Sequence, residues 1–318
     1  MAIEMSMEPS LRMRLSDSLH AIARMLLRRA PLTAPAEALS CNPFFIIGSG
    51  RSGNTLLRAM LVAHPDLSIP PESFVLPAVI RKFYRYDYIL WPDLAWMVIT
   101  EFETYPEFRF WELDTRELYE RALALPEKER SLAKLLDLIY VAYEEKHQPG
   151  AKRWGDKTPM NTLCLERLNW VYPNAQYIHI IRDGRDVAAS YLAAGIFPDL
   201  KSACARWVTS IERAQEFGKR VGPERYCEVR YEGLVRNPAP CLQNLSAFLE
   251  VTYSEIMLDF WKVSDQLGDT QQKHHTNLKN PVNPKSIGRW REKFDGDTQG
   301  QMDQWLRGKL RELGYVTG

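Results

Sequence analysis

A glycine-rich loop between a strand and a helix constrains the fold more than any other feature of this sequence. Residues 48–55 read Gly-Ser-Gly-Arg-Ser-Gly-Asn-Thr, after an apolar β-run at 44–47 and before a helical pattern at 55–63. This context matches the phosphate-binding loop G-x-x-x-x-G-K-[ST]. Its glycines let backbone N–H groups close around an anion at a helix N-terminus. The loop therefore predicts a phosphate site in an α/β fold of the P-loop type.

The lysine of this motif is replaced. Asn54 stands at the lysine position, and Arg51 lies inside the loop. That lysine normally binds the β- and γ-phosphates, so the expected ligand is a phosphorylated nucleotide other than ordinary ATP or GTP. The alternative is a glycine-rich turn that only joins a strand to a helix, and the flanking strand and helix favour the phosphate site.

The rest of the chain alternates strands with helices. Further strands are expected at 67–69, 152–156, 176–181 and 225–230, each followed by a helical pattern. This order predicts three layers, with a mainly parallel central sheet flanked by helices. Residues 73–147 are aromatic-rich and carry no strand pattern, so we expect a helical insertion that shapes a substrate pocket. One domain is expected over 43–318, after an N-terminal amphipathic helix and connector at 1–42.

Composition excludes several classes of protein. The net charge is +1, so no global field favours nucleic acid as a partner, and anion binding must be local. The five cysteines form no C-x-x-C pair, which disfavours a zinc site or a disulfide framework and fits a reducing, cytoplasmic compartment. No run approaches the roughly 20 apolar residues of a membrane span. The sequence leaves the oligomeric state open.

Residues 11–29 form a basic amphipathic pattern. One side carries leucine, isoleucine and methionine, and five arginines surround it. One interpretation is a helix that packs on the body of the protein. The other is a helix that lies on an anionic membrane surface and makes the protein membrane-peripheral.

A second cluster of basic residues follows the strand at 176–181. It begins Arg182-Asp183-Gly184-Arg185, and Ser190 follows eight residues after the first arginine. Ligands of open α/β sheets bind beyond the carboxyl ends of the strands, so Arg182 and the glycine-rich loop share one edge. Arginine suits bidentate phosphate recognition, and Ser190 supplies a hydroxyl for the same group. The alternative is an Arg/Asp cluster that pairs with itself at a helix start.

Together the two motifs resemble those of the sulfotransferase family, whose donor is 3′-phosphoadenosine 5′-phosphosulfate (PAPS). The family's 5′-phosphosulfate loop typically reads Arg-Ser-Gly-Thr-Thr-Leu, and its 3′-phosphate element reads Arg-Asp-Gly-Arg with a following serine. The resemblance extends from about residue 44 to 294 and is greatest to the tyrosylprotein type and related bacterial enzymes. The matching 5′-loop positions are Arg51-Ser52-Gly53-Asn54-Thr55-Leu56, and the 3′-element is matched by 182–185 with Ser190.

This resemblance assigns roles to further residues. It implies Glu72 as the base that takes the acceptor's proton, Lys157 as the contact to the bridging oxygen of the leaving group, and Arg51 as the cation on the 5′-phosphate and sulfuryl oxygens. It also implies nucleotide contacts from Tyr231 and from the segment 286–291, which includes Arg289. No metal is expected. From the residues alone, the favoured interpretation of Glu72 is a helix-terminus carboxylate that complements the dipole, and that of Lys157 is a solvated loop lysine.

Two departures from the tyrosylprotein enzymes bear on the acceptor. Those enzymes place arginines two and six residues after the catalytic glutamate, where this chain has Phe74 and Ala78, and Ala194 replaces their third 3′-phosphate arginine. With an aromatic-rich insertion, these changes predict a hydroxyl on a sugar, lipid or small molecule rather than tyrosine in an acidic peptide.

Two other classes remain open at this stage. A P-loop kinase of a nucleotide or small metabolite would share the fold but should carry the missing lysine. A non-catalytic nucleotide-binding adaptor would not need Glu72 and Lys157.

Overall fold

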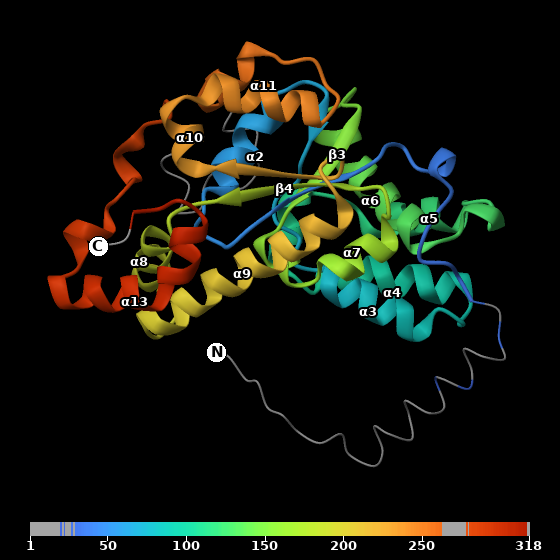
Figure 1. Cartoon of the computed structure of the whole chain (residues 1–318). Coiled ribbons are helices and arrows are strands. Elements are labelled where there is room, and N and C mark those ends of the chain that lie inside the picture. Colours follow the sequence, from blue (N-terminus) through green and yellow to red (C-terminus); the bar gives the residue numbers. More distant parts are fainter. Residues whose placement is uncertain are drawn as a thin grey trace.

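A parallel sheet of five strands forms the centre of the protein, in the order β2-β3-β1-β4-β5 (Figure 1). This computed structural model describes residues 29–262 and 280–316, together with residues 20, 22, 27 and 278. The predicted fold class is confirmed, and each strand lies within one residue of its expected position. The strands are β1 (Phe44–Ile47), β2 (Leu67–Ser68), β3 (Arg153–Lys157), β4 (Gln176–Ile181) and β5 (Tyr226–Arg230).

Helices cover both faces of the sheet because its central strands are apolar on both sides. In β1, Phe44 and Ile46 pack on one face, while Phe45 and Ile47 pack on the other. Figure 1 shows the first face covered by α2 (Asn54–Val62), α10 (Tyr231–Arg236) and α11 (Pro238–Phe248), and the second by α7 (Leu165–Val171) and α9 (Leu200–Val221). A third cluster joins α9 to α8 (Gly184–Ala193) and α13 (Gly296–Glu312).

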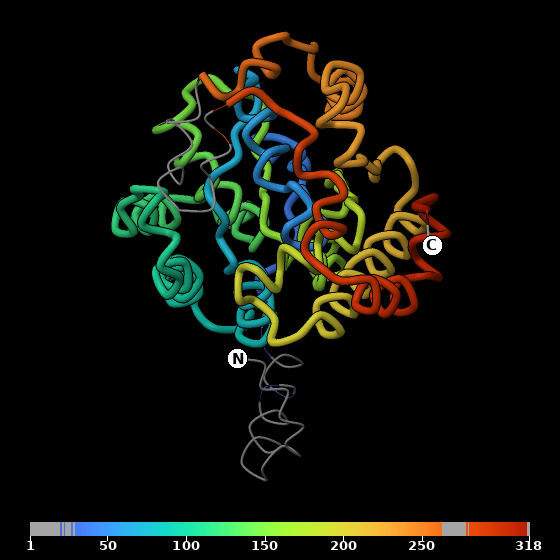
Figure 2. Tube along the Cα trace, turned by 90° about the vertical axis from the view of Figure 1, so that its left-hand side faces the viewer, coloured from blue at the N-terminus to red at the C-terminus, as the bar shows by residue number. Residues whose placement is uncertain are grey.

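The segment at 73–147 is helical, as predicted. It contains α3 (Leu76–Tyr86), α4 (Trp91–Glu103), α5 (Thr115–Leu123) and α6 (Leu132–His147), with short 3₁₀ turns η2 (Pro106–Trp111) and η3 (Glu127–Glu129). The side chains of Asp114 and Ser131 cap α5 and α6, accepting hydrogen bonds from backbone N–H groups two or three residues later. Figure 2 shows this insertion and the C-terminal helix on opposite sides of the molecule.

Two elements differ from the sequence expectations. The helix α9 was not identified from the sequence, although Asp199 caps it by accepting a hydrogen bond of 2.7 Å from the backbone N–H of Ser202. The helical pattern expected after the strand at 152–156 begins with a 3₁₀ turn, η4 (Pro159–Leu163), and only then forms α7. The amphipathic segment 11–29 lies largely outside the described residues. Within the described part of the chain, no helix has the length and apolarity needed to span a bilayer.

Candidate active site

A cleft of about 1250 Å³ opens at the carboxyl edge of the sheet. The loop after β1, the end of β3 and the loop after β4 meet there, as the topology of an open α/β sheet requires. Of the predicted site residues, Ser52 and Lys157 are buried behind the cleft surface. The others line it: Arg51, Gly53, Asn54, Thr55, Leu56, Glu72, Arg182, Ser190, Tyr231 and Arg289.

The glycine-rich loop ends at Gly53, which is the N-cap of α2. Its φ is +97°, in the left-handed region, and no side chain caps the helix. A methyl group added at Gly53 would lie 2.4 Å from Cδ2 of Tyr231, so both the backbone and the neighbouring ring require glycine here. The N–H groups at the start of α2 thus lie open to the cleft, where the sequence predicts an anion.

Asn54 stabilises the loop internally. Its Nδ2 donates a 2.8 Å hydrogen bond to the carbonyl oxygen of Ser49, and its side chain is buried. The amide nitrogen is therefore committed to the loop, whereas Oδ1 of Asn54 has no hydrogen-bond partner among the described residues. By contrast, the buried Oγ of Ser52 has no hydrogen-bond partner among the described residues. A buried hydroxyl of this kind fits a polar ligand group in the loop.

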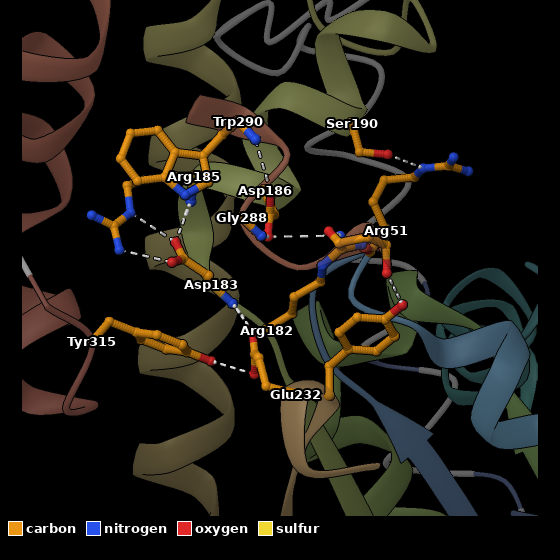
Figure 3. A network of polar contacts seen from close by, with 12 residues as sticks. Arg51, Arg182, Asp183, Arg185, Asp186, Ser190, Glu232, Gly288, Trp290 and Tyr315 are labelled. Carbon is orange, nitrogen blue, oxygen red and sulfur yellow. Dashed lines mark hydrogen bonds and ion pairs between the residues drawn. The ribbon is translucent and has the colours of Figure 1, made fainter. Parts of the chain in front are cut away.

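Two arginines converge beside this loop (Figure 3). Nε of Arg51 donates to Oγ of Ser190 at 3.0 Å, and Nη1 of Arg182 donates to the carbonyl oxygen of Arg51 at 3.2 Å. Burial and, secondarily, the charge of Arg182 lower the pKa of Arg51. Neighbouring guanidinium groups repel each other, so an anion bound between them would be strongly favoured.

Arg182 is held in one orientation by the opposite wall of the cleft. Nη2 donates to the carbonyl oxygen of Ser286 at 2.6 Å, and the guanidinium lies 4.5 Å above the ring of Tyr231. The hydroxyl of Tyr231 in turn lies 2.5 Å from Oγ of Ser286. Nε of Arg182 is buried without a partner in the described structure. An oriented guanidinium with an unused donor matches the chemistry of phosphate binding.

The remaining charges of the Arg-Asp-Gly-Arg-Asp sequence support this arrangement. Asp186 accepts hydrogen bonds from the backbone N–H groups of Gly288 (2.7 Å) and Trp290 (3.1 Å), and so fixes the 286–290 segment against α8 (Figure 3). Arg185 pairs with Asp183 at 2.8 Å. Arg185 therefore pairs within its own cluster, as the alternative interpretation expected. Arg182 lines the cleft and lies 3.8 Å from Asp186 of the same cluster. The role of Asp186 could not be predicted from its position in the sequence.

Trp290 and Arg289 differ in position although they are neighbours. Trp290 is buried, with its ring 4.3 Å from the guanidinium of Arg185, and belongs to the core. Arg289 is exposed and lines the cleft. Only Arg289 can reach a ligand in the cleft through its side chain.

Glu72 and Lys157 form an ion pair at the base of the cleft. Nζ of Lys157 donates to Oε1 of Glu72 and lies 3.4 Å from Oγ1 of Thr55 in the loop. The side chain of Lys157 is fully buried, so it is not a solvated loop lysine. The helix-dipole interpretation of Glu72 is also wrong, because α3 begins only at Leu76. The structure thus places a carboxylate and an ammonium beside the predicted phosphate loop.

Comparison with known proteins identifies this arrangement. Residues 43–255 match the model of the sulfotransferase family. A putative protein-tyrosine sulfotransferase of Caenorhabditis briggsae is 28% identical over 283 residues, which cover 86% of this chain and 89% of that protein. The Drosophila melanogaster protein-tyrosine sulfotransferase is 24% identical over 283 residues, covering 85% of this chain and 51% of the longer fly protein.

Solved structures agree with this match at the level of the fold. The sulfotransferase domain of the Synechococcus olefin synthase superposes with a TM-score of 0.63 at 23% identity, covering 92% of this chain and 98% of that domain. The sulfotransferase domain of the curacin biosynthetic pathway gives a TM-score of 0.58 at 21% identity, with 86% and 98% covered. The family match spans more than half of the chain and includes both arginine loops, that is, the glycine-rich loop with Arg51 and the loop that begins at Arg182. This protein therefore belongs to the sulfotransferase family and is a sulfotransferase.

Proposed function

We propose that this enzyme transfers a sulfuryl group from PAPS to an acceptor hydroxyl, without a metal ion. The observation that carries the proposal is the Glu72–Lys157 pair beside the phosphate loop, with Arg51 and Arg182 on the same edge. Sulfuryl transfer to an alcohol needs a base for the proton, cations for the developing charge and in-line positioning. These side chains offer the base and the cations.

The two ends of the donor suit different parts of the cleft. The 5′-phosphosulfate fits the N-terminus of α2, where Arg51 and the buried hydroxyl of Ser52 also lie. The 3′-phosphate fits the unused Nε of Arg182 and the hydroxyl of Ser190. Tyr231 closes the space between them, since its ring contacts both Gly53 and Arg182. ATP carries no 3′-phosphate, so this second site favours a 3′-phosphorylated nucleotide.

In the proposed reaction the acceptor oxygen attacks sulfur, and an oxygen–sulfur bond forms as the bond from sulfur to the 5′-phosphate oxygen breaks. Glu72 takes the acceptor's proton. Lys157 stabilises the negative charge that develops on the leaving phosphate oxygen, and Arg51 stabilises the sulfuryl oxygens. The products are the sulfated acceptor and 3′-phosphoadenosine 5′-phosphate (PAP).

The acceptor side of the cleft is mostly apolar. Phe74 and Phe110 come from the insertion, and Met160, Ile196 and Phe197 from segments after β3 and α8. Two charged side chains also line this part of the cleft: Glu107 comes from the insertion and Arg206 from α9. Aromatic walls favour a neutral or amphiphilic acceptor, such as a hydroxyl on a sugar, lipid or small molecule. Peptide tyrosine is the second candidate, because the relatives named above are protein-tyrosine sulfotransferases.

Thermal-shift measurements test the donor. PAP should stabilise the enzyme in the presence of EDTA, because any ligand that binds only the folded state raises the unfolding temperature. Stabilisation by ATP–Mg²⁺ but not by PAP would refute the proposal and favour a kinase. A side-by-side assay with ³⁵S-labelled PAPS, an acidic tyrosine peptide, a neutral glycolipid and an alcohol panel tests the acceptor. Selective sulfation of the peptide would refute the proposed acceptor class.

A further inference from the structure

Asp156 is a buried carboxylate next to the proposed reaction site. It precedes Lys157 on β3 and is 1% exposed. Its oxygens accept hydrogen bonds from the hydroxyl of Tyr140 (2.7 Å), Oγ of Ser73 (3.2 Å) and Nδ2 of Asn161 (2.6 Å). A buried carboxylate is strongly unfavourable unless such donors surround it. Asp156 does not line the cleft, and the proposed mechanism gives it no step.

The contacts of Ser73 explain why a carboxylate is placed there. Ser73 follows Glu72 in the chain, and its Oγ donates to Asp156. Its backbone N–H donates to Oγ1 of Thr158 at 3.2 Å. Ser73 is therefore bonded to the residues on both sides of Lys157. These two hydrogen bonds hold the segment that carries the base against the strand that carries the cation.

The next residue shows that this segment needs such support. Phe74 has a φ of +53°, in the left-handed region that bulky residues rarely adopt. Conformations of this kind persist only where surrounding contacts fix them. The backbone turns there from the cleft into α3, so the bonds of Ser73 hold the chain immediately before the strained residue.

Asp156 also connects the helical insertion to the site. Tyr140 lies on α6, and its ring stacks on Trp154 of β3 at 4.2 Å. Asn161 lies on η4, next to Met160 of the acceptor wall. One carboxylate thus joins the base segment, the insertion and the turn that borders the acceptor side.

We propose that Asp156 is a positioning residue for sulfuryl transfer: through Ser73 it holds Glu72 opposite Lys157, and it fixes the acceptor wall relative to both. This inference rests on the proposed function. It predicts that loss of the carboxylate impairs turnover while the donor site, built on β1 and β4, remains intact.

Asp156→Asn is the first test, and hydrolysis of ³⁵S-labelled PAPS by water is the assay. We expect kcat to fall at least about tenfold, because misplacement of a base by a fraction of an ångström has effects of this size. The Kd for PAP should stay within about twofold of wild type, since no contact to the loop or to Arg182 is removed. A variant that keeps the wild-type kcat would overturn the inference.

Asp137→Asn is the matched control. Asp137 is also 1% exposed and accepts hydrogen bonds from Ser40 and from Nε1 of Trp154, two residues before Asp156 on the same strand. Among the described residues it makes no hydrogen bond or ion pair with Glu72, Ser73 or Lys157, so its loss should lower thermal stability but leave kcat unchanged. Equal losses of kcat in the two variants would show that Asp156 only stabilises the fold.

Ser73→Ala keeps the test decisive if Asp156→Asn folds poorly. It removes one hydroxyl and retains the backbone bond to Thr158. The single variant should lower kcat several-fold, and a wild-type kcat in this variant would overturn the inference. Where Asp156→Asn folds, the double variant should have the kcat of Asp156→Asn alone, because the two substitutions act on Glu72 through one hydrogen bond. Strictly multiplicative losses would overturn the inference. A wild-type enzyme that binds no PAP and releases no sulfate from PAPS would instead refute the proposed function.

Discussion

Arg182→Ala should weaken the binding of PAP far more than the binding of adenosine 5′-monophosphate. The Arg182 side chain is 11% exposed, and its unpartnered Nε lies on the edge of the sheet that carries Ser190. A charge-assisted hydrogen bond to the 3′-phosphate contributes about 1.5–3 kcal/mol. The Kd for PAP should therefore rise roughly 10- to 150-fold.

Part of that loss is shared by both nucleotides. Arg182 also holds the carbonyl oxygens of Arg51 and Ser286, so its removal loosens the loop and the opposite wall of the cleft. The contribution that is specific to the 3′-phosphate is measured by the Kd for adenosine 5′-monophosphate divided by the Kd for PAP, because the common loss cancels in this ratio. We expect Arg182→Ala to lower this ratio by most of the predicted increase in the Kd for PAP.

Isothermal titration calorimetry at fixed ionic strength measures both Kd values, since salt screens charge interactions. Arg116→Ala is a suitable control: this arginine is exposed on α5, in the helical insertion. The reasoning fails if wild type binds the two nucleotides equally, or if Arg182→Ala weakens both to the same extent.

Three further substitutions test other parts of the structure. Glu72→Gln should lower PAPS turnover roughly a hundredfold with little change in the Kd for PAP, as expected for a general base; wild-type turnover would exclude that role. Gly53→Ala should destabilise the protein by about 1–3 kcal/mol in urea unfolding, because of the φ of +97° and the 2.4 Å approach to Tyr231; an unchanged midpoint would contradict this. Burial, with the charges of Asp137 and Glu145, raises the pKa of Glu144 from 4.5 to about 7. The folded state then binds more protons than the unfolded state between these values, so this group makes stability fall as pH rises from 4.5 to 7. Glu144→Gln should reduce that fall, and an unaltered pH profile of the unfolding midpoint would refute the assignment.

The strands and both arginine loops could be predicted because their signals are local. Four consecutive apolar residues before a glycine-rich loop specify a buried strand and an anion site without knowledge of the rest of the chain. The same holds for Arg182, whose position follows from the end of β4 and the rule that ligands bind at that edge.

The environment of the proposed catalytic pair could not be predicted in this way. Glu72 and Lys157 are 85 residues apart in sequence, and the parallel pairing of β2 with β3 brings Glu72, four residues after β2, beside Lys157 at the end of β3. The burial of Lys157 depends on tertiary packing, so the local sequence favoured a solvated lysine. Asp156 gave no signal either, because its donors come from three separate segments.

The replaced lysine of the loop has a consequence for how such enzymes diverge from nucleotide kinases. Asn54 closes the loop through Ser49, while the ammonium group beside Thr55 comes from Lys157 on a neighbouring strand. Restoring a lysine at position 54 would remove that closure and add a second ammonium near the first. We therefore expect Asn54→Lys to disturb the loop rather than to create the phosphate site of a kinase. A change of Lys157 in the same protein would remove the repulsion between the two ammonium groups.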